Sequence, residues 1–236
     1  MFQLRSKSSK YEARPEGVRP YILLMHYTGM QSAEAAIERL TDPESGVNVH
    51  YIVDEEGRVL DLVPEECRAW HAGVSYWQGE SDINSASIGV EIVNPGHEFG
   101  YREFPQVQMK AVLKLSQEII KRHEIKYVLG HSDVAPERKQ DPGELFDWKW
   151  LAKNGIGLWP NPDDKDREQA EIIARNDFEA EKLFTEYGYN PMAAFQDVVT
   201  AFQRHYYPEI FKENQQGSVD QETIARLYAL INHSKV

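Results

Sequence analysis

The stretch Gly130–Gly143 concentrates side chains that can carry out chemistry. A histidine, a lysine and two aspartates lie there in a loop bracketed by prolines and glycines, whose restricted backbone can hold side chains in place. A second histidine, His26, ends the apolar run that begins at Tyr21. Together His26, His131 and Asp141 offer two imidazoles and one carboxylate, which suits a catalytic zinc whose fourth position is open to water. This set indicates a zinc hydrolase.

Each member of the set also has a purely structural interpretation. His131 could end a strand and Asp141 could cap a helix beside Pro142, which is the more frequent role for either residue alone. The combination with His26 favours the metal site. Because Cys67 is the only cysteine, no intramolecular disulfide can form, and we expect a zinc site that uses no thiolate.

Two further residues offer what hydrolysis needs. Glu91 is a carboxylate inside the apolar run Ile88–Val93, and a glutamate is rarely buried unless it is paired or faces a cavity. It fits a general base for the attacking water, although an edge-strand carboxylate that faces solvent has the same pattern. Lys139 could stabilise the carbonyl oxygen that becomes negative during attack; the alternative is an ordinary solvated lysine.

Other ring side chains divide between ligand contacts and structural roles. Trp70 and His71 precede a glycine-bearing loop and suit contact with a sugar or a peptide. His71 is also a fourth candidate metal ligand, and Trp70 also fits a position in the core. His50 is expected to bond across the sheet. We expect the remaining histidines at the surface, namely His97, His123, His205 and His233.

Alternating patterns of strand and helix run from residue 20 to about 160. Continuous apolar runs predict buried strands, alternation on both sides of a turn predicts a hairpin, and helical spacing after a capping residue predicts helices. The expected strands are 21–25, 49–53, 59–62, 87–93 and 127–129, and the expected helices begin near Ser32 and Pro105. The pattern predicts an α/β fold with a mixed central β-sheet flanked by helices.

The chain changes character after residue 160. Residues 161–168 are acidic and contain a proline, which is typical of a solvated linker. A small C-terminal three-helix domain should follow, with helices at 178–187, from Asn190 with Pro191 at the first helical position, and from Asp220. We therefore predict two domains, 1–160 and 169–236. The second is expected to fold alone and to raise the local concentration of a polymeric ligand.

Composition excludes some classes of protein. The formal net charge is −12 and the basic residues form no long run, which argues against a nucleic-acid partner. No window approaches the roughly 20 apolar residues of a membrane span. Residues 1–17 are polar and basic and lack the apolar centre of a signal peptide. We expect neither a transmembrane segment nor a signal peptide in this chain.

Four ordered motifs resemble those of the zinc-dependent N-acetylmuramoyl-L-alanine amidases, over about residues 20–155. The motifs are Met25–Thr28, Arg68–Gly73, Ser87–Glu91 and Gly130–Gly143. The helical segment resembles the small peptidoglycan-binding domain that some of these amidases carry. This two-domain layout is similar to the AmiD-like branch more than to the single-domain AmpD-like branch.

The resemblance implies a reaction and roles for the residues. It implies that His26, His131 and Asp141 bind Zn²⁺, that Glu91 activates the water and that Lys139 stabilises the tetrahedral intermediate. The substrate would be peptidoglycan or its (anhydro)muropeptide fragments, cut between N-acetylmuramic acid and L-alanine. We expect contacts to this substrate from Tyr27, Trp70, His71, Asn94 and Arg138. The substrate favours the cell envelope or periplasm, or the cytoplasm if Met1 is the native start, and we favour a monomer.

Two other classes of function remain open. One is a peptidoglycan-recognition protein that binds the stem peptide without cutting it, although such binders commonly lack a metal ligand and all three candidates are present here. The other is a zinc peptidase that acts within the stem peptide. The helical motif His-Glu-x-x-His of one large peptidase class is absent from the chain, which disfavours that class.

Overall fold

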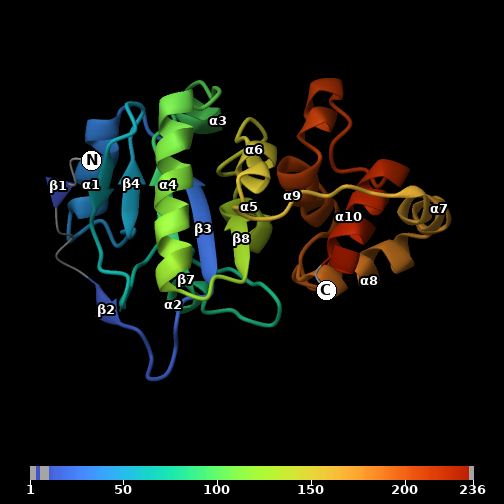
Figure 1. Cartoon of the computed structure of the whole chain (residues 1–236), viewed down its shortest axis with the longest axis horizontal. Coiled ribbons are helices and arrows are strands. Elements are labelled where there is room, and N and C mark those ends of the chain that lie inside the picture. The colour runs from blue at the N-terminus through green and yellow to red at the C-terminus, as the bar shows by residue number, and fades with distance from the viewer. Residues whose placement is uncertain (1–3, 6–10, 234–236) are drawn as a thin grey trace.

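The computed structural model describes residues 4–5 and 11–233 of the chain and is centred on a mixed sheet (Figure 1). The sheet has six strands in the order β1-β5-β4-β7-β3-β8. In that order they are Leu4–Arg5, Val59–Asp61, Tyr51–Val53, Ser87–Ile92, Ile22–Tyr27 and Tyr127–Gly130. Strands β4 and β5 form the predicted antiparallel hairpin, and the other pairs are parallel. A separate antiparallel pair joins β2 (Glu12–Ala13) to β6 (Cys67–Arg68). The predicted mixed sheet is confirmed.

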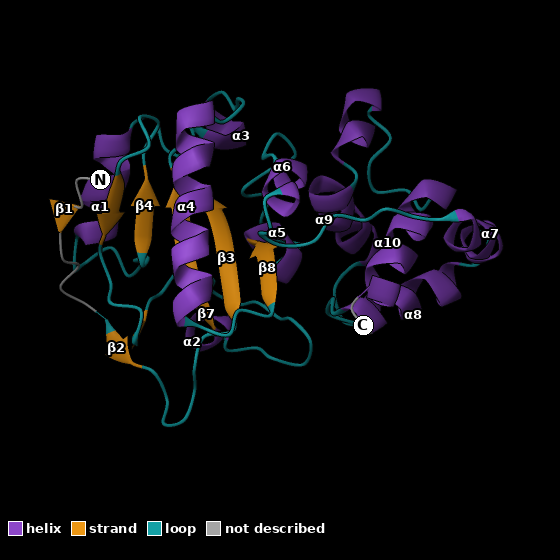
Figure 2. Ribbon diagram, in the orientation of Figure 1, coloured by secondary structure: helices purple, strands orange, loops and turns teal. Residues whose placement is uncertain are grey.

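Helices begin where the sequence provides caps. Ser32 caps α1 (Ala33–Thr41) by accepting a hydrogen bond from the backbone N–H of Ala35. The long helix α4 (Gln106–Arg122) follows Pro105 and crosses in front of the sheet in Figure 2. Four short helices lie in the connections, namely α2 (Ile83–Ala86), α3 (Gly96–Phe99), α5 (His131–Val134) and α6 (Trp148–Lys153).

The central strands are buried on both faces. Because side chains alternate along a strand, Leu23 and Met25 of β3 share a cluster with Val112 of α4. Ile22 and Leu24 point to the other face and belong to a second cluster. Burial on both faces is typical of parallel strands, and it explains why β3 reads as a continuous apolar run.

Two expectations after residue 160 were wrong in detail. The predicted linker 161–168 overlaps a helix, α7 (Asp164–Ile173), which starts with a capping box between Asp163 and Asp166. These acidic residues favour a helix start because they bond the free N–H groups of the first turn. The helix expected from Pro191 starts only at Phe195, because the side chain of Asn190 instead accepts from Met192 N in a turn.

Up to residue 233, where the described part of the chain ends, the C-terminal segment holds four α-helices and one 3₁₀ helix, in place of the three helices predicted. After α7 come α8 (Asp177–Tyr187), α9 (Phe195–Tyr206), η1 (Pro208–Glu213) and α10 (Gln221–His233). They lie beside β8 and α5 in Figure 1. Their apolar side chains, among them Phe184, Phe202 and Leu227, belong to the same buried cluster as Ile22 and Leu24 of β3. The helices and the sheet therefore share one hydrophobic core.

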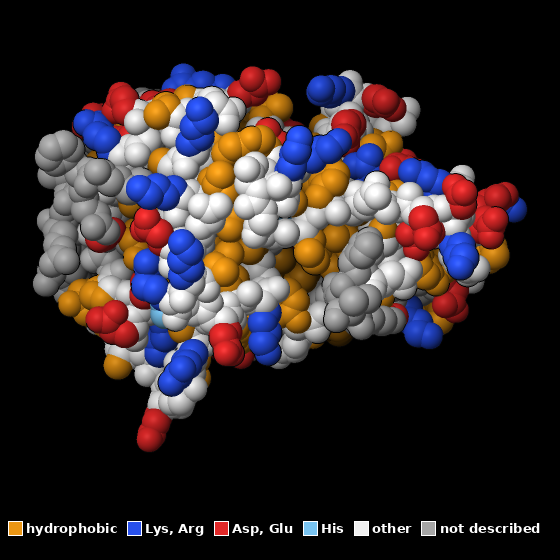
Figure 3. Space-filling view, viewed as in Figure 1, with side chains coloured by type: hydrophobic (Ala, Val, Ile, Leu, Met, Phe, Trp, Pro, Cys, Tyr) orange, Lys and Arg blue, Asp and Glu red, His pale blue; other side chains and the backbone are white. Residues whose placement is uncertain are grey.

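The surface carries charges of both signs. On the face in Figure 3, Lys and Arg alternate with Asp and Glu around the edge, and apolar side chains lie between the sheet and the C-terminal helices. Among the described residues, no helix combines the length and the apolar character needed to cross a bilayer.

Candidate active site

Strand register brings the candidate residues to one edge of the sheet. In the parallel pairing of β3 with β7, His26 lies opposite Glu91, so both side chains point to the same face. In the pairing of β3 with β8, Met25 lies opposite Gly130, and His131 follows directly as the first residue of α5. Ligands of open α/β sheets commonly bind outside the carboxyl ends of the strands. The site lies at this position.

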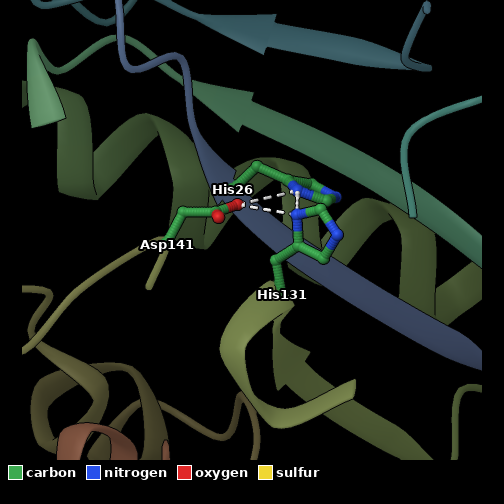
Figure 4. A group of neighbouring side chains, drawn as sticks. All are labelled: His26, His131 and Asp141. Carbon is green, nitrogen blue, oxygen red and sulfur yellow. Dashed lines mark hydrogen bonds and ion pairs between the residues drawn. The ribbon is translucent and has the colours of Figure 1, made fainter. Parts of the chain in front are cut away.

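Three atoms converge at the site (Figure 4). His26 Nδ1 lies 3.0 Å from His131 Nδ1, and each of these nitrogens lies 3.0 Å from Asp141 Oδ2. The three residues are 1%, 3% and 6% exposed. Their side chains come from β3, from the start of α5 and from the loop after α5. The structure therefore brings together the three residues that the sequence analysis proposed as metal ligands.

The tautomer of His131 and the pKa values of His26 and Asp141 favour the binding of a metal cation. His131 Nε2 donates to the carbonyl oxygen of Ala72, so in the neutral ring Nδ1 carries a lone pair. Burial and the neighbouring His131 lower the pKa of His26 to about 4, against the opposite effect of Asp141. Burial alone would raise the pKa of Asp141, but the two histidines hold it well below its usual range. The cluster presents a carboxylate and imidazole lone pairs with few protons to separate them.

The donor set fits zinc. Zinc binds imidazole nitrogen and carboxylate oxygen at about 2.0–2.2 Å, and three atoms 3.0 Å apart can all lie within that distance of one point. Two histidines and one carboxylate are also the ligand number of catalytic zinc sites, which leave a further position open.

Glu91 is largely buried beside the cluster and lines the same pocket. Among the described residues, its Oε2 is a buried atom without a hydrogen-bond partner. Burial and the negative charge of Asp141 raise its pKa well above the usual value, while the charge of Lys139 acts in the opposite direction. A buried carboxyl group with an unpartnered oxygen in a polar pocket is a candidate general base. The alternative, in which Glu91 is an edge-strand carboxylate that faces solvent, is therefore wrong.

His71 lies against His26. Its Nδ1 is 3.0 Å from His26 Nε2, the ring nitrogen that faces away from the converging atoms. The ring lies over Gly89 of β7, where any Cβ would come within 2.6 Å of it. A glycine at this strand position is therefore required for His71 to reach His26. His71 is a partner of the first histidine and not a fourth member of the converging set.

The pocket around the cluster has a volume of about 850 Å³, within the range of small-molecule sites. Four of the five residues expected to contact substrate line it, as does Lys139; the four are Tyr27, Trp70, His71 and Arg138. Asn94 is absent from this lining. It is buried, donates to the carbonyl of Arg102 and accepts from the N–H of Gly96. Its side chain is therefore used to hold the loop after β7.

Two of the histidines expected at the surface lie elsewhere. His97 lines the pocket, with Nδ1 3.0 Å from the hydroxyl of Tyr27. Its position just after β7, at the carboxyl end of a parallel strand, was a signal for this role. His205 is 2% exposed and bonds Asp133. It follows Phe202 by three positions and so shares the apolar stripe of its helix, which was a signal for burial. His50 does bond across the sheet, by accepting from Gly89 N.

Comparison with known proteins supports one family. The family model for N-acetylmuramoyl-L-alanine amidase matches residues 16–144, more than half of the chain. The chain is 33% identical to N-acetylmuramoyl-L-alanine amidase AmiD of Escherichia coli (strain K12), across 98% of this chain and 88% of AmiD. It is 31% identical to the 1,6-anhydro-N-acetylmuramyl-L-alanine amidase AmpD of Enterobacter cloacae, but across only 60% of this chain.

Solved structures extend the similarity to the C-terminal helices. The crystal structure of AmpDh3 from Pseudomonas aeruginosa matches with a TM-score of 0.81 and 34% identity, covering 97% of each chain. The complex of E. coli AmiD with the substrate anhydro-N-acetylmuramic acid-L-Ala-D-γ-Glu-L-Lys matches with a TM-score of 0.77 and 33% identity, covering 93% of this chain and 92% of AmiD. Because motifs, fold and full-length similarity agree, this chain belongs to the N-acetylmuramoyl-L-alanine amidase family.

Proposed function

We propose that this protein hydrolyses the amide bond between the lactyl group of N-acetylmuramic acid and the L-alanine of the stem peptide, in a zinc-dependent reaction. The observation that carries the proposal is the convergence of His26 Nδ1, His131 Nδ1 and Asp141 Oδ2, each 3.0 Å from the other two, in the pocket that Glu91 also lines.

In this proposal His26, His131 and Asp141 hold the zinc. When bound, zinc supplies a Lewis acid that polarises the amide carbonyl and makes water a stronger nucleophile. His71 keeps the ring of His26 in place through its contact with Nε2, and the carbonyl of Ala72 does the same for His131. Such partners fix the tautomer and the orientation of a ligand ring.

Glu91 and Lys139 carry the remaining chemistry. Glu91 accepts a proton from the attacking water and returns it to the nitrogen of L-alanine as the C–N bond breaks. Lys139 places a positive charge near the carbonyl oxygen, which becomes negative as the tetrahedral intermediate forms. The products are a muramic acid with a free lactyl carboxylate and a stem peptide with a free amino group.

We further propose that the substrate is a peptidoglycan fragment of the anhydromuropeptide type. AmiD was solved with such a substrate, and AmpDh3 in complex with an anhydromuramic pentapeptide matches this chain with a TM-score of 0.80. Tyr27, Trp70, His71 and Arg138 line the pocket that would contact it. Trp70 is exposed and stacks with Arg68, whose guanidinium lies 4.1 Å from the ring. An exposed aromatic ring held in this way offers a flat surface to a sugar.

The proposal extends to the arrangement of the chain. We assign catalysis to the domain at 1–160 and binding of the wall polymer to the helical domain at 169–236. The substrate favours a location in the cell envelope or periplasm, and we expect a monomer. Pull-down of the full chain by insoluble peptidoglycan, with and without excess soluble anhydromuramyl tripeptide to occupy the catalytic pocket, tests the assignment of polymer binding.

Mass spectrometry of a purified anhydromuramyl tripeptide after incubation with the protein tests the reaction. We expect two products, anhydro-N-acetylmuramic acid and a tripeptide that begins with a free L-alanine. Loss of the C-terminal residue alone would show a peptidase instead. Binding of an unchanged substrate, in the presence of stoichiometric zinc, would show a recognition protein.

A further inference from the structure

Two neighbouring residues of α9 contact two different walls of the pocket. Arg204 and His205 are both buried, at 7% and 2% exposure. Both side chains leave the C-terminal helices and bond to residues of the sheet-containing half of the chain. Figure 1 shows α9 as the C-terminal helix beside α5 and α6. The helix therefore lies where it can act on the site.

The first connection runs from His205 to the segment that carries His131. His205 Nδ1 donates to Asp133 Oδ2 at 2.7 Å. Asp133 lies on α5, two residues after His131, and its carboxylate also accepts from Gly130 N and from the hydroxyl of Tyr189. The carboxylate of Asp133 thus connects Gly130, the residue before His131, with the C-terminal segment that contains Tyr189 and His205. Its hydrogen bonds fix the start of α5.

The second connection runs from Arg204 to the opposite wall. Arg204 Nε lies 3.3 Å from Glu144 Oε2, and Glu144 accepts from His97 Nε2 at 3.2 Å. With its proton on Nε2, the neutral ring of His97 has a lone pair on Nδ1, so the hydroxyl of Tyr27 donates to it at 3.0 Å. The chain of bonds ends on Tyr27, which follows His26 and lines the pocket.

Both connections start from a buried polar side chain, although Glu144 and His97 in the second are partly exposed. The His205 ring lies between Trp148 and Tyr206, with centroids 3.8 and 3.7 Å away. The guanidinium of Arg204 lies 5.0 Å from the ring of Phe211. Stacking on both sides leaves the His205 ring little freedom to turn away from Asp133, and the ring of Phe211 restricts Arg204 on one side. A buried network with satisfied hydrogen bonds holds its members in one arrangement.

We propose that Arg204 and His205 are positioning residues, through which α9 fixes the two walls of the zinc pocket, His131 on one side and Tyr27 on the other. The inference rests on the proposed function for what the pocket binds. It assigns the C-terminal helices a part in forming the catalytic site, in addition to binding the wall polymer. The two branches act on different properties, the His205 branch on zinc affinity and the Arg204 branch on substrate binding.

The experiment compares variants of the full chain that differ in whether they reach the pocket. His205→Phe keeps a stacked ring but removes the donor to Asp133, and Arg204→Met keeps the aliphatic stem but removes the contact to Glu144. Arg226→Met is the matched control. Arg226 also forms ion pairs, with Glu222 and Glu209, and lies 4.2 Å over the ring of Tyr207, all within the C-terminal helices.

Three quantities are measured for each variant: zinc affinity by competition with a chelating dye, KM and kcat on anhydromuramyl tripeptide, and the melting temperature. We expect His205→Phe to weaken zinc binding by about 10- to 100-fold, the usual effect of losing a partner that orients a metal ligand. We expect Arg204→Met to raise KM on the order of 10-fold through misplacement of the tyrosine. Arg226→Met should lower only the melting temperature.

A conservative variant of His205 should rescue zinc binding. His205→Asn keeps an N–H near the position of Nδ1 and should retain zinc affinity within about threefold of the wild type, below the effect of a lost partner. If His205→Phe and Arg204→Met lower the melting temperature as Arg226→Met does, yet keep zinc affinity and KM, then α9 only stabilises the fold and the inference is wrong. A wild-type protein that binds zinc but leaves the tripeptide intact would overturn the proposed reaction, while the zinc measurement would still test the His205 branch.

Discussion

Two buried histidine–carboxylate clusters lie close together in this protein. They differ in how many N–H and O–H donors are available to their acceptor atoms. The first is formed by His26, His131 and Asp141, and the second by His205 and Asp133. Burial does not distinguish them, since side-chain exposure is 1% for His26 and 8% for Asp141, against 3% for His205 and 0% for Asp133. Their residue types do not distinguish them either.

The number of donors does distinguish them. Asp133 accepts from three N–H or O–H groups, those of Gly130, Tyr189 and His205, so its contacts are ordinary hydrogen bonds. In the first cluster His131 has its proton on the far nitrogen, where it donates to Ala72 O. The three 3.0 Å contacts then share at most the single proton of His26. Converging acceptors that lack donors are what a metal cation satisfies, whereas a satisfied carboxylate is a structural element.

The largest effect is expected from breaking the converging cluster. His131→Ala should remove measurable turnover and leave well under one equivalent of bound zinc, because the two remaining ligands cannot hold the ion in catalytic geometry. Zinc content by atomic absorption and a muropeptide assay check this. His123→Ala is the control, since His123 contacts Glu65 outside the pocket. A fully active His131→Ala protein with stoichiometric zinc would end the metal assignment.

Glu91→Gln should separate chemistry from metal binding. The variant retains the shape of the side chain but cannot accept the proton of water, so kcat should fall about 10²-fold or more, the usual contribution of a general base. Zinc content should stay at the wild-type level. Turnover at the wild-type rate would assign Glu91 to structure alone.

Removing one donor from the satisfied cluster should cost stability without loss of metal, because Gly130 N and His205 Nδ1 still hold Asp133 in place. Tyr189→Phe removes the hydroxyl that donates to Asp133 Oδ1 at 2.8 Å, and loss of a hydrogen bond to a buried carboxylate costs about 1–3 kcal/mol. Denaturant unfolding measures the change in the free energy of unfolding. The zinc stoichiometry of the folded variant should remain one. Loss of the metal without loss of stability would reverse the roles of the two clusters.

The smallest effect is expected from disrupting a third histidine–carboxylate contact, between His123 and Glu65. The quantity affected is the free energy of unfolding. Burial alone would raise the pKa of Glu65, but hydrogen bonds from Arg122, Tyr51 and His123 lower it to about 2. A lowered folded-state pKa stabilises the fold above the unfolded-state pKa near 4.3, and this stabilisation is lost as the pH falls towards 2.

Glu65→Gln tests this pH dependence. The stability difference between wild type and Glu65→Gln should be constant above about pH 5.5 and should shrink between about pH 5 and pH 2, because Glu65 then binds a proton in the unfolded chain but not in the folded protein. Since Arg122 is partly exposed, with 45% side-chain exposure, the total effect should be about 1 kcal/mol or less. A difference that grows as the pH falls would contradict the cause given for the lowered pKa.

Local sequence patterns predicted most of the fold. The continuous apolar run of β3, the alternation in the β4–β5 hairpin and the cap at Ser32 each depend on neighbours in sequence, and the structure has these elements where they were predicted. The start of α7 was missed because its capping box consists of acidic residues that also read as a linker. Charge content alone does not separate a solvated linker from a helix start.

The candidate site was predictable where residue type determines chemistry. The set of His26, His131 and Asp141 followed from ligand types, and strand register brings its members together. The burial of His205 was missed although its spacing from Phe202 indicated it, but its stacking partner Trp148 is far away in sequence and no local pattern indicates that contact. The same holds for Asn94, whose amide is used by the loop carbonyl of Arg102. Such roles depend on tertiary partners that a sequence pattern does not name.

Anomalous diffraction at the zinc absorption edge, from crystals of the full chain grown with zinc, tests the central claim most directly. The account predicts one strong peak within coordination distance of His26 Nδ1, His131 Nδ1 and Asp141 Oδ2, about 2.0–2.2 Å from each, and no peak at His205 and Asp133. A zinc peak at the second cluster, or a saturated crystal with no peak at the first, would contradict the account.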